Sequence, residues 1–432
     1  MMLEMPEHQE EMQCNLEFGK IKSLQILLVE KKVGFLRSPA TLPNSLRVLE
    51  WPGCPATSLP HDFHLKNLVI LDLSYSYFGW DKPLENSKVL RHLIVVGCKN
   101  IRRIPDISGF HNLTKLCVGE CTNLIEIHDS VGSLLHLKVF CAEGCTKLTI
   151  GLSRIELKSL EHLCFPGCSS LVMFPEVLAP MHKLNHVDLG GTGIRNLPPS
   201  MQNLKGIKVL SMGKGQMLEI NESSNFFQNL PMFFPNLETL YLQNLDITIL
   251  PASIEECHSL KFLHVTNCKK LQEIRGLPLN INQFYAANCS VKANSLILKL
   301  RQAIDSAAMR ICFLPGREIP ELFDHSSGGN STDKSIEECH SLKFLHVTNC
   351  KKLQEIRGLP LNINQFYAAN CSVKANSLIL KLRQAIDSAA MRICFLPGRE
   401  IPELFDHSSG GNSTDKRYNN RNRISTQLPC DG

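Results

Sequence analysis

The sequence predicts an α/β solenoid of short parallel strands with little helix, and three observations support this fold class. An apolar triplet with the spacing L-x-x-L-x-L occurs twelve times between Leu24 and Ala286, at intervals of 21 to 24 residues and one interval of 30. Cysteine recurs at the ninth position of seven of these units. Proline recurs in the second half of several units, where it disfavours helix. Together these patterns indicate repeated units that stack in one dimension around a shared core.

The period of the triplets identifies the kind of repeat. Intervals of this length are typical of leucine-rich repeats, in which each unit adds one strand to the parallel sheet on the concave face of a horseshoe. We expect a lead-in over residues 1–23 and the solenoid over 24–289, with a concave surface suited to binding a partner. The triplets begin at Leu24, Leu46, Leu68, Leu90, Leu113, Leu137, Leu160, Leu184, Ile207, Leu237, Leu260 and Ile281.

The ninth position of each unit predicts how the strand ends. Leucine-rich repeats place Asn or Cys there, because a small polar side chain must pair with loop backbone inside the stack. A buried thiol suits this place, so these cysteines are interpreted as structural rather than as metal ligands or disulfides. The residues concerned are Cys54, Cys98, Cys121, Cys145, Cys168, Cys268 and Cys289.

Composition and charge exclude several function classes. The 432 residues are 43% hydrophobic and carry a net charge of only +5, which does not suggest a nucleic-acid partner. No run approaches 18 apolar residues, and residues 1–14 lack the apolar segment of a signal peptide, so we expect no membrane association. Many unpaired thiols favour a reducing, cytoplasmic or nucleo-cytoplasmic location.

The second half of each unit indicates a particular family. Apolar residues three apart are often followed by proline, as at Ile101 and Ile104-Pro105, so the outer wall should be extended or 3₁₀ rather than α-helical. These phrases, together with 42–51 (LPNSLRVLEW) and 144–148 (GCTKL), resemble the plant TIR-type nucleotide-binding leucine-rich-repeat (TIR-NB-LRR) disease-resistance receptors from about Phe18 to Phe323. The resemblance implies a role in plant defence and signal transduction. It also implies two kinds of partner, a pathogen effector protein and the NB-ARC and TIR domains of a longer receptor.

The segment after the repeats resembles the start of the jelly-roll/Ig-like domain that follows the repeats in those receptors. We expect a helix from Asn294 to about Met309, with apolar residues on one stripe, then a short strand from Arg310 to Leu314. Residues 315–323 (PGREIPELF) follow, with Leu322 where the family usually has tryptophan. We interpret residues 290–334 as a truncated post-repeat domain.

An exact repetition, either a recent tandem duplication or an error in assembling the gene, shapes the rest of the chain. Residues 253–334 recur without change as 335–416, which predicts duplicated repeats over 335–372 and a duplicated post-repeat segment over 373–416. A basic polar tail occupies 417–432. Two strands bury too little to be stable alone, so we expect the second pair, at Leu342 and Ile363, to dock loosely. The 30-residue interval should leave the solenoid as a loop between about Met217 and Phe234.

Motifs for catalysis or cofactor binding are missing, so we expect neither an enzyme nor a cofactor. The sequence contains no phosphate-binding G-x-x-x-x-G-K-[ST], no G-x-S-x-G, no H-E-x-x-H and no paired C-x-x-C. One cluster on the concave face, formed by Cys141, Cys164, His162 and His186, has the residue types of a metal or redox site. The alternative is that these side chains merely line the groove, because parallel strands hold ligands in a flat ladder whereas zinc prefers a tetrahedron.

Positions two, three and five of each unit should face a partner. Aromatic residues near the C-terminal end of the array favour a binding patch there, because a solvated face needs none. The alternatives are that these side chains simply cover the strands, or that the chain is an adaptor such as the substrate arm of a ubiquitin ligase. No F-box-like helical segment precedes Leu24, which counts against the adaptor. The candidate residues are Glu50, Asp72, Arg91, Lys115, His162, His186, Asp188, Lys208, Tyr241, Phe262, His264 and Tyr285.

Overall fold

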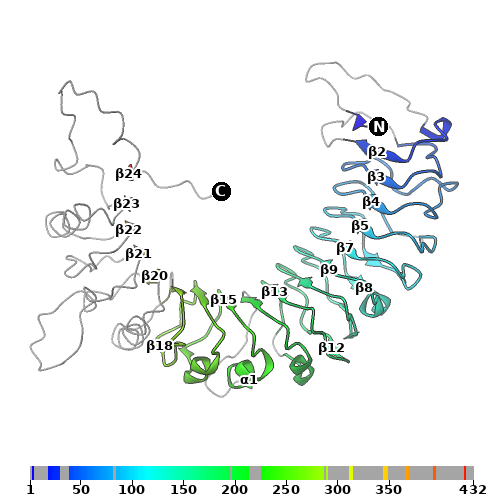
Figure 1. Ribbon diagram of the computed structural model, residues 1–432. Helices are drawn as coiled ribbons and strands as arrows, with labels where there is room; N and C mark the ends of the chain where they lie inside the picture. Colours follow the sequence, from blue (N-terminus) through cyan, green and yellow to red (C-terminus); the bar gives the residue numbers. More distant parts are fainter. Residues whose placement is uncertain are drawn as a thin grey trace, which may run out of the picture. The chain divides into compact units, whose positions relative to one another are not determined.

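The computed structural model describes residues 2–3, 18–29, 38–80, 84–194, 197–213, 225–286, 289, 311–314, 344–348, 365–369, 393–395 and 423–424. They fall into two compact units. Unit 1 comprises Met1–Leu218 and Met232–Leu237, and unit 2 comprises Glu219–Pro231 and Glu238–Gly432. In both units the dominant element is a short strand that recurs once per repeat (Figure 1).

The strands of unit 1 form a parallel sheet in sequence order, which confirms the predicted leucine-rich-repeat solenoid. From β2 on, each strand starts at the third position of its repeat and pairs in register with the same positions of the next repeat, whereas β1 belongs to the lead-in and pairs with β2. The strands are β1 (Met2–Leu3), β2 (Ile26–Val29), β3 (Val48–Glu50), β4 (Ile70–Asp72), β5 (His92–Ile94), β7 (Lys115–Cys117), β9 (Val139–Cys141), β11 (His162–Cys164), β13 (His186–Gly190) and β14 (Val209–Gly213).

Burial along each strand alternates with the period of two that strands impose. The fourth-position side chains, such as Leu93 and Leu116, are fully buried, and the third- and fifth-position side chains beside them are half-exposed. We call the half-exposed side of the strands the open face. The apolar triplet therefore fixes both the core and the residues available to a partner.

The outer segments are extended or 3₁₀, as the prolines predicted. Two-residue strands pair in parallel on this side: β6 (Arg103–Ile104) with β8 (Glu126–Ile127), β10 (Arg154–Ile155) with β12 (Glu176–Val177), and β16 (Ile249–Leu250) with β18 (Glu273–Ile274). The 3₁₀ helices are η1 (Phe18–Lys20), η2 (Asp129–Ser133), η3 (Pro199–Asn203) and η4 (Ala252–Glu256). Pro198 and Pro251 stand directly before η3 and η4, where a missing N–H costs nothing.

The long interval between Ile207 and Leu237 differs from the expected loop, because part of it is the α-helix α1 (Asn225–Phe233). Phe227, Leu230 and Phe234 are buried at spacings of three and four, which is the apolar stripe of a helix. The helix tolerates Pro231 because it is short and ends two residues later. Residues 214–224 lie outside the described residues, and continuity of the sheet across this interval stays a prediction.

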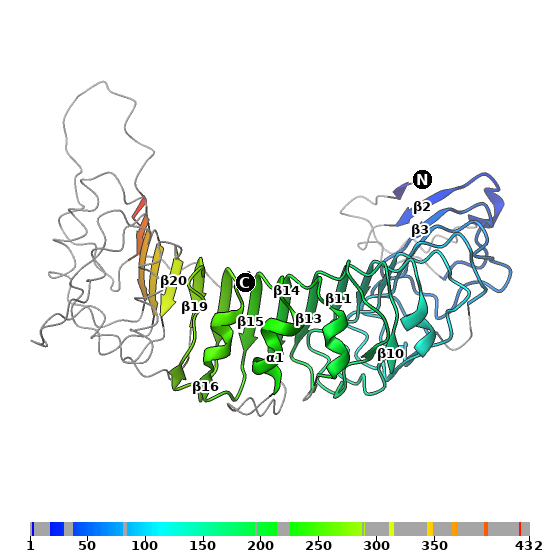
Figure 2. The ribbon, with the colours of Figure 1, turned by 60° about the horizontal axis from the view of Figure 1, so that its bottom comes forward.

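Unit 2 continues the same strand pattern across both copies of the duplicated segment (Figure 2). Each strand pairs in parallel with the next one along the chain. The strands are β15 (Thr239–Gln243), β17 (Phe262–Thr266), β19 (Gln283–Tyr285), β20 (Ile311–Leu314), β21 (Phe344–Thr348), β22 (Gln365–Ala369), β23 (Ile393–Phe395) and β24 (Arg423–Ile424).

The strand expected from Arg310 to Leu314 is present as β20, and it pairs in parallel with β19. The interpretation of residues 290–334 as a truncated post-repeat domain stays a prediction. β21 pairs in parallel with β20, and the looser docking of the second copy also stays a prediction. The expected helices at 294–309 and 376–391, and most of the tail at 417–432, lie outside the described residues.

The position-nine thiols close the end of each strand. Cys121 Sγ donates to Val95 O at 3.1 Å, and Val95 is the sixth residue of the preceding repeat. Cys98, Cys145, Cys168, Cys268 and Cys289 make the same contact at 2.8–3.7 Å. Because buried carbonyls need a donor, these cysteines are structural, as their position predicted.

Position eight has a requirement that the sequence reasoning missed. Nine described residues at this position have a positive φ, in the region that L-residues rarely adopt. Five are glycines, such as Gly53 with φ 78°, and the others are Tyr75, Glu120, Asn244 and Asn267. The chain turns there so that the position-eight N–H donates to the following repeat, as Gly97 N does to Gly119 O at 2.8 Å.

Within the part of the chain that the structure describes, no helix combines the length and apolar character that a bilayer crossing requires.

Replacing Cys121 with Ala should lower the free energy of unfolding by about 1–3 kcal/mol, because Val95 O loses a buried donor. Cys121→Ser should cost clearly less, since the hydroxyl still donates. Thermal unfolding of both variants gives the comparison. Equal losses for Ala and Ser would assign the effect to lost volume alone.

Gly53→Ala should destabilise unit 1 by about 1 kcal/mol through backbone strain alone. A Cβ at Gly53 would meet no atom within 4 Å, so steric crowding does not contribute. Gly53→Asn should cost less although Asn is larger, because Asn tolerates positive φ and occupies the same position in two other repeats. A larger shift in thermal midpoint for Asn than for Ala would contradict this explanation.

Candidate functional site

The open face consists of two rows of side chains that run across the strands. The position-three row and the position-five row are set by strand register, since parallel neighbours lie about 4.8 Å apart. In unit 1 the position-five row runs from Leu28 through Glu50, Asp72, Ile94, Cys117, Cys141, Cys164 and Asp188 to Ser211. All the candidate partner residues in positions three and five are half-exposed on this face.

The N-terminal part of the face is acidic. Glu50 and Asp72 are register partners on β3 and β4. Asp72 Oδ1 accepts from Ser74 N at 2.9 Å and from Ser74 Oγ at 2.6 Å, which fixes the orientation of its carboxylate. The two expected acidic residues are therefore brought together.

The next two strands carry a basic group. Lys115 is the register partner of His92, and Arg91 precedes His92 at position two. Burial lowers the pKa of His92, and the charges of Lys115 and Arg91 lower it further, while the carboxylate of Glu50 opposes them. Sequence reasoning selected Arg91 and Lys115 but missed His92, although its position-three place was a sufficient signal.

The rings of His162 and His186 lie side by side on β11 and β13, with centroids 5.6 Å apart and planes at 53°. Burial lowers the pKa of His186, while the carboxylate of Asp188 opposes that effect. Asp188 Oδ1 accepts from Gly190 N at 2.9 Å, so the carboxylate is held near the end of its strand.

The thiols and histidines considered as a metal site do not assemble into one. Cys141 and Cys164 are register partners in the position-five row, whereas His162 and His186 occupy the position-three row. No group of three or more His, Cys, Asp or Glu side chains among the described residues is arranged to hold a metal ion. The flat ladder of parallel strands gives a physical reason, because its ligands cannot surround a cation.

Charged residues at position two pair sideways between repeats. Lys138 Nζ lies 3.1 Å from Glu161 Oε1, and Lys261 Nζ lies 3.1 Å from Glu238 Oε2. Such exposed pairs contribute little stability, so they mainly balance charge along one border of the face. Lys208 occupies the equivalent, exposed position beside β14.

The open face of unit 2 carries a stack of aromatic rings. The rings of Tyr241 and His264 lie with centroids 4.6 Å apart and planes at 33°, and His264 and Tyr285 lie 4.1 Å apart and nearly parallel at 11°. Burial lowers the pKa of His264 to about 4, so the imidazole is uncharged at neutral pH. Phe262 lies two residues before His264 on the same face, outside the stack but beside it. Strand register therefore brings the three rings together, with His264 at the centre of the stack, and their role in binding stays a prediction.

The register of the following strands extends this row. Tyr285 pairs with Phe313 of β20, which is followed in the same register by His346, Tyr367 and Phe395. The order His, Tyr, Phe thus occurs twice, because the duplication repeats three strands in an unchanged register. The backbone places seven aromatic or imidazole residues in one row of unit 2.

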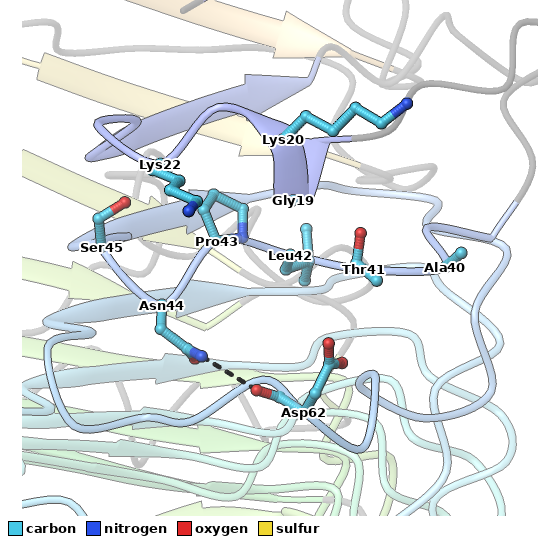
Figure 3. A pocket seen from close by; sticks show the side chains of 10 residues that line it. All are labelled: Gly19, Lys20, Lys22, Ala40, Thr41, Leu42, Pro43, Asn44, Ser45 and Asp62. Carbon is cyan, nitrogen blue, oxygen red and sulfur yellow. Dashed lines mark hydrogen bonds between the residues drawn. The ribbon is translucent and has the colours of Figure 1, made fainter.

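A hollow of about 690 Å³ lies at the N-terminal end of unit 1 (Figure 3). Its polar side chains already bind backbone: Asn44 Nδ2 donates to Asp62 O of the next repeat at 3.0 Å, and Ser45 Oγ donates to Leu24 O at 2.7 Å. Lys20 and Lys22 line its rim. Because these groups join loops of adjacent repeats, the hollow is a seam between repeats rather than a chemical site.

Known proteins resemble this chain over much of its length. No family model matches the chain. Over its repeats, the chain resembles plant disease resistance proteins. It is 27% identical over 321 residues to the disease resistance protein RML1A of Arabidopsis thaliana, covering 70% of this chain and 31% of the relative. The disease resistance protein RPS6 of the same plant is 29% identical over 402 residues, covering 86% and 34%. The TMV resistance protein N of Nicotiana glutinosa is 24% identical over 369 residues, covering 76% and 30%.

The chain spans about a third of the length of these relatives. Among solved structures, the functional domain of InlJ from Listeria monocytogenes matches with a TM-score of 0.49 and 15% identity, covering 76% of this chain and 65% of that one. The ectodomain of the plant receptor kinase GASSHO1/SCHENGEN3 from Arabidopsis thaliana matches with a TM-score of 0.44 and 15% identity, covering 84% and 43%.

The depressed pKa of His264 makes the stability of unit 2 depend on pH. Between pH 6.5, the ordinary pKa of the group, and about 4, the unfolded chain binds a proton that the folded stack excludes. The free energy of unfolding should therefore fall as the pH is lowered through this window. His264→Gln should weaken the dependence, measured as thermal midpoint against pH. His258→Gln, at an exposed histidine of the same unit, is the control, and equal slopes for the two variants would contradict the assignment.

Proposed function

We propose that the chain is the recognition region of a plant intracellular immune receptor and binds a protein partner, a pathogen effector, through its open face. The single observation that supports this best is the stack of Tyr241, His264 and Tyr285, with Phe262 beside it, on a half-exposed strand surface. The similarity to disease resistance proteins gives the biological setting.

The chemistry of this patch suits the centre of a protein interface. Aromatic side chains dominate binding energy at interfaces, because they bury much area at little cost in side-chain entropy. The stack is uncharged at neutral pH, since burial holds His264 neutral, so covering it costs no desolvation of a net charge. The acidic strands β3 and β4 and the basic strands β5 and β7 lie in unit 1, where they would steer a partner rather than anchor it.

The proposed setting also defines the other partners. The matched region covers only about a third of each relative, so we place the chain within a receptor whose NB-ARC and TIR domains contact the repeats. Such a receptor acts in the cytoplasm, or shuttles to the nucleus, and the many unpaired thiols suit a reducing compartment. In this setting the repeats recognise the effector, and chemistry belongs to other domains.

The test uses a complete receptor that carries this repeat region. Tyr241→Ala and Phe262→Ala should each weaken effector co-precipitation by roughly 30-fold, because truncating a central aromatic anchor costs about 2 kcal/mol. Glu50→Ala and Asp72→Ala, on the same face of unit 1, serve as matched controls and should change binding much less. If the aromatic variants bind the effector normally and the acidic variants lose binding, the anchor lies on the acidic strands and the proposal is wrong.

A further inference from the structure

Three thiols of the position-five row lie on three consecutive strands. Cys117, Cys141 and Cys164 belong to β7, β9 and β11, and strand register makes Cys141 the partner of both others. All three are unpaired and half-exposed on the open face. The function proposed above does not use these three thiols, because it rests on other residues of the open face.

These thiols differ from those at position nine of the same repeats. Cys121, Cys145 and Cys168 are fully buried, and each donates to a backbone carbonyl of the preceding repeat. The position-five side chains instead reach solvent, so a small reagent has access to them. Each of the three repeats thus carries one protected thiol and one accessible thiol.

The spacing of the row permits disulfides between neighbours only. Register partners on adjacent parallel strands are about 4.8 Å apart, within the range of about 4.4–6.8 Å that disulfide-linked Cα atoms span. Cys117 and Cys164 are separated by two such steps, roughly 9.6 Å, which exceeds the limit of about 7 Å for a bridge without backbone movement. Any disulfide in the row must therefore include Cys141.

We propose that this thiol row is a site of reversible disulfide formation, in which Cys141 pairs with either Cys117 or Cys164 and the remaining thiol stays free. The flat ladder that keeps these side chains from surrounding a metal ion also makes them register partners on adjacent strands.

The oxidant we name is a low-molecular-weight disulfide such as oxidised glutathione. The Cys141 thiol loses its proton and attacks one sulfur of the oxidant, so a mixed disulfide forms and one glutathione leaves as a thiolate that takes up a proton. The thiol of Cys117 or Cys164 then loses its proton and attacks Cys141 Sγ, which releases the second glutathione. Two protein thiols are oxidised to one disulfide, and the oxidant is reduced to two glutathione molecules.

The surroundings of the thiols make this reaction slow. Burial, reinforced by the neighbouring thiol of Cys141, raises the pKa of Cys117 to about 11 and that of Cys164 to about 12. Only the thiolate attacks a disulfide, so few molecules are reactive at neutral pH. The row should stay reduced during brief exposure and cross-link during sustained oxidation.

The test is peptide mapping of the full chain after prolonged incubation with oxidised glutathione, alkylation and digestion with trypsin without reductant. Cleavage after Lys115, Lys138, Lys158 and Lys183, together with Arg154 and Lys147, places the three thiols in separate peptides, 116–138, 139–147 and 159–183. We expect peptide 139–147 joined to one of the other two, with fragment ions that assign the bond to Cys141 rather than Cys145. Two alkylatable thiols per chain should be lost and then recovered with dithiothreitol.

Three variants sharpen the test. Cys141→Ser should abolish the cross-link, whereas Cys117→Ser and Cys164→Ser should each leave the other pairing intact. The unmodified chain provides the result independently if a variant does not fold. A cross-link that persists in Cys141→Ser, one that involves only position-nine cysteines, or glutathione adducts that never resolve into a protein disulfide would overturn the proposal. Effector binding is not part of the readout, so failure here leaves the proposed function untouched.

Discussion

Six repeats are joined to the preceding repeat by the same contact, a hydrogen bond from the position-nine thiol to the position-six carbonyl. The position-six residues that accept these bonds are buried, as at Val95, which directly follows β5. A buried carbonyl without a donor is costly, and the thiol of the next repeat supplies the donor. Because each of these donors comes from the next repeat, the bonds hold adjacent repeats at a fixed level.

The alignment of adjacent repeats determines which side chains lie next to one another on the open face. Strands that all end at the same height place equivalent positions side by side, so every chemical property of the open face appears as a row. The acidic pair, the thiol row and the aromatic stack are three results of one register. A shift of a single residue in one strand would exchange open-face and core side chains, so the buried fourth position protects the surface rows as strictly as the core.

The sequence was sufficient for the elements that repeat and insufficient for those that do not. Strand positions, the buried thiols and the composition of the face followed from the period, because burial recurs with it. The turn at position eight was missed because position eight is not always glycine. Tyr75 and Glu120 also adopt a positive φ there, and their residue types do not indicate it. The helix α1 was missed for two reasons. Its apolar stripe covers little more than two turns, and the helix contains Pro231, which normally disfavours a helix. Ring geometry, such as the nearly parallel planes of His264 and Tyr285, depends on side-chain torsions that no pattern encodes.

The 82-residue duplication has a geometric property that its sequence identity alone does not reveal. Phe262, Gln283 and Ile311 are register partners on consecutive strands, and their copies Phe344, Gln365 and Ile393 are register partners in the same order. The segment therefore behaves as a module of three whole strands with compatible ends, since its last strand accepts its own first strand as a neighbour. The first strand of the segment thus accepts two different neighbours, β15 in one copy and β20 in the other.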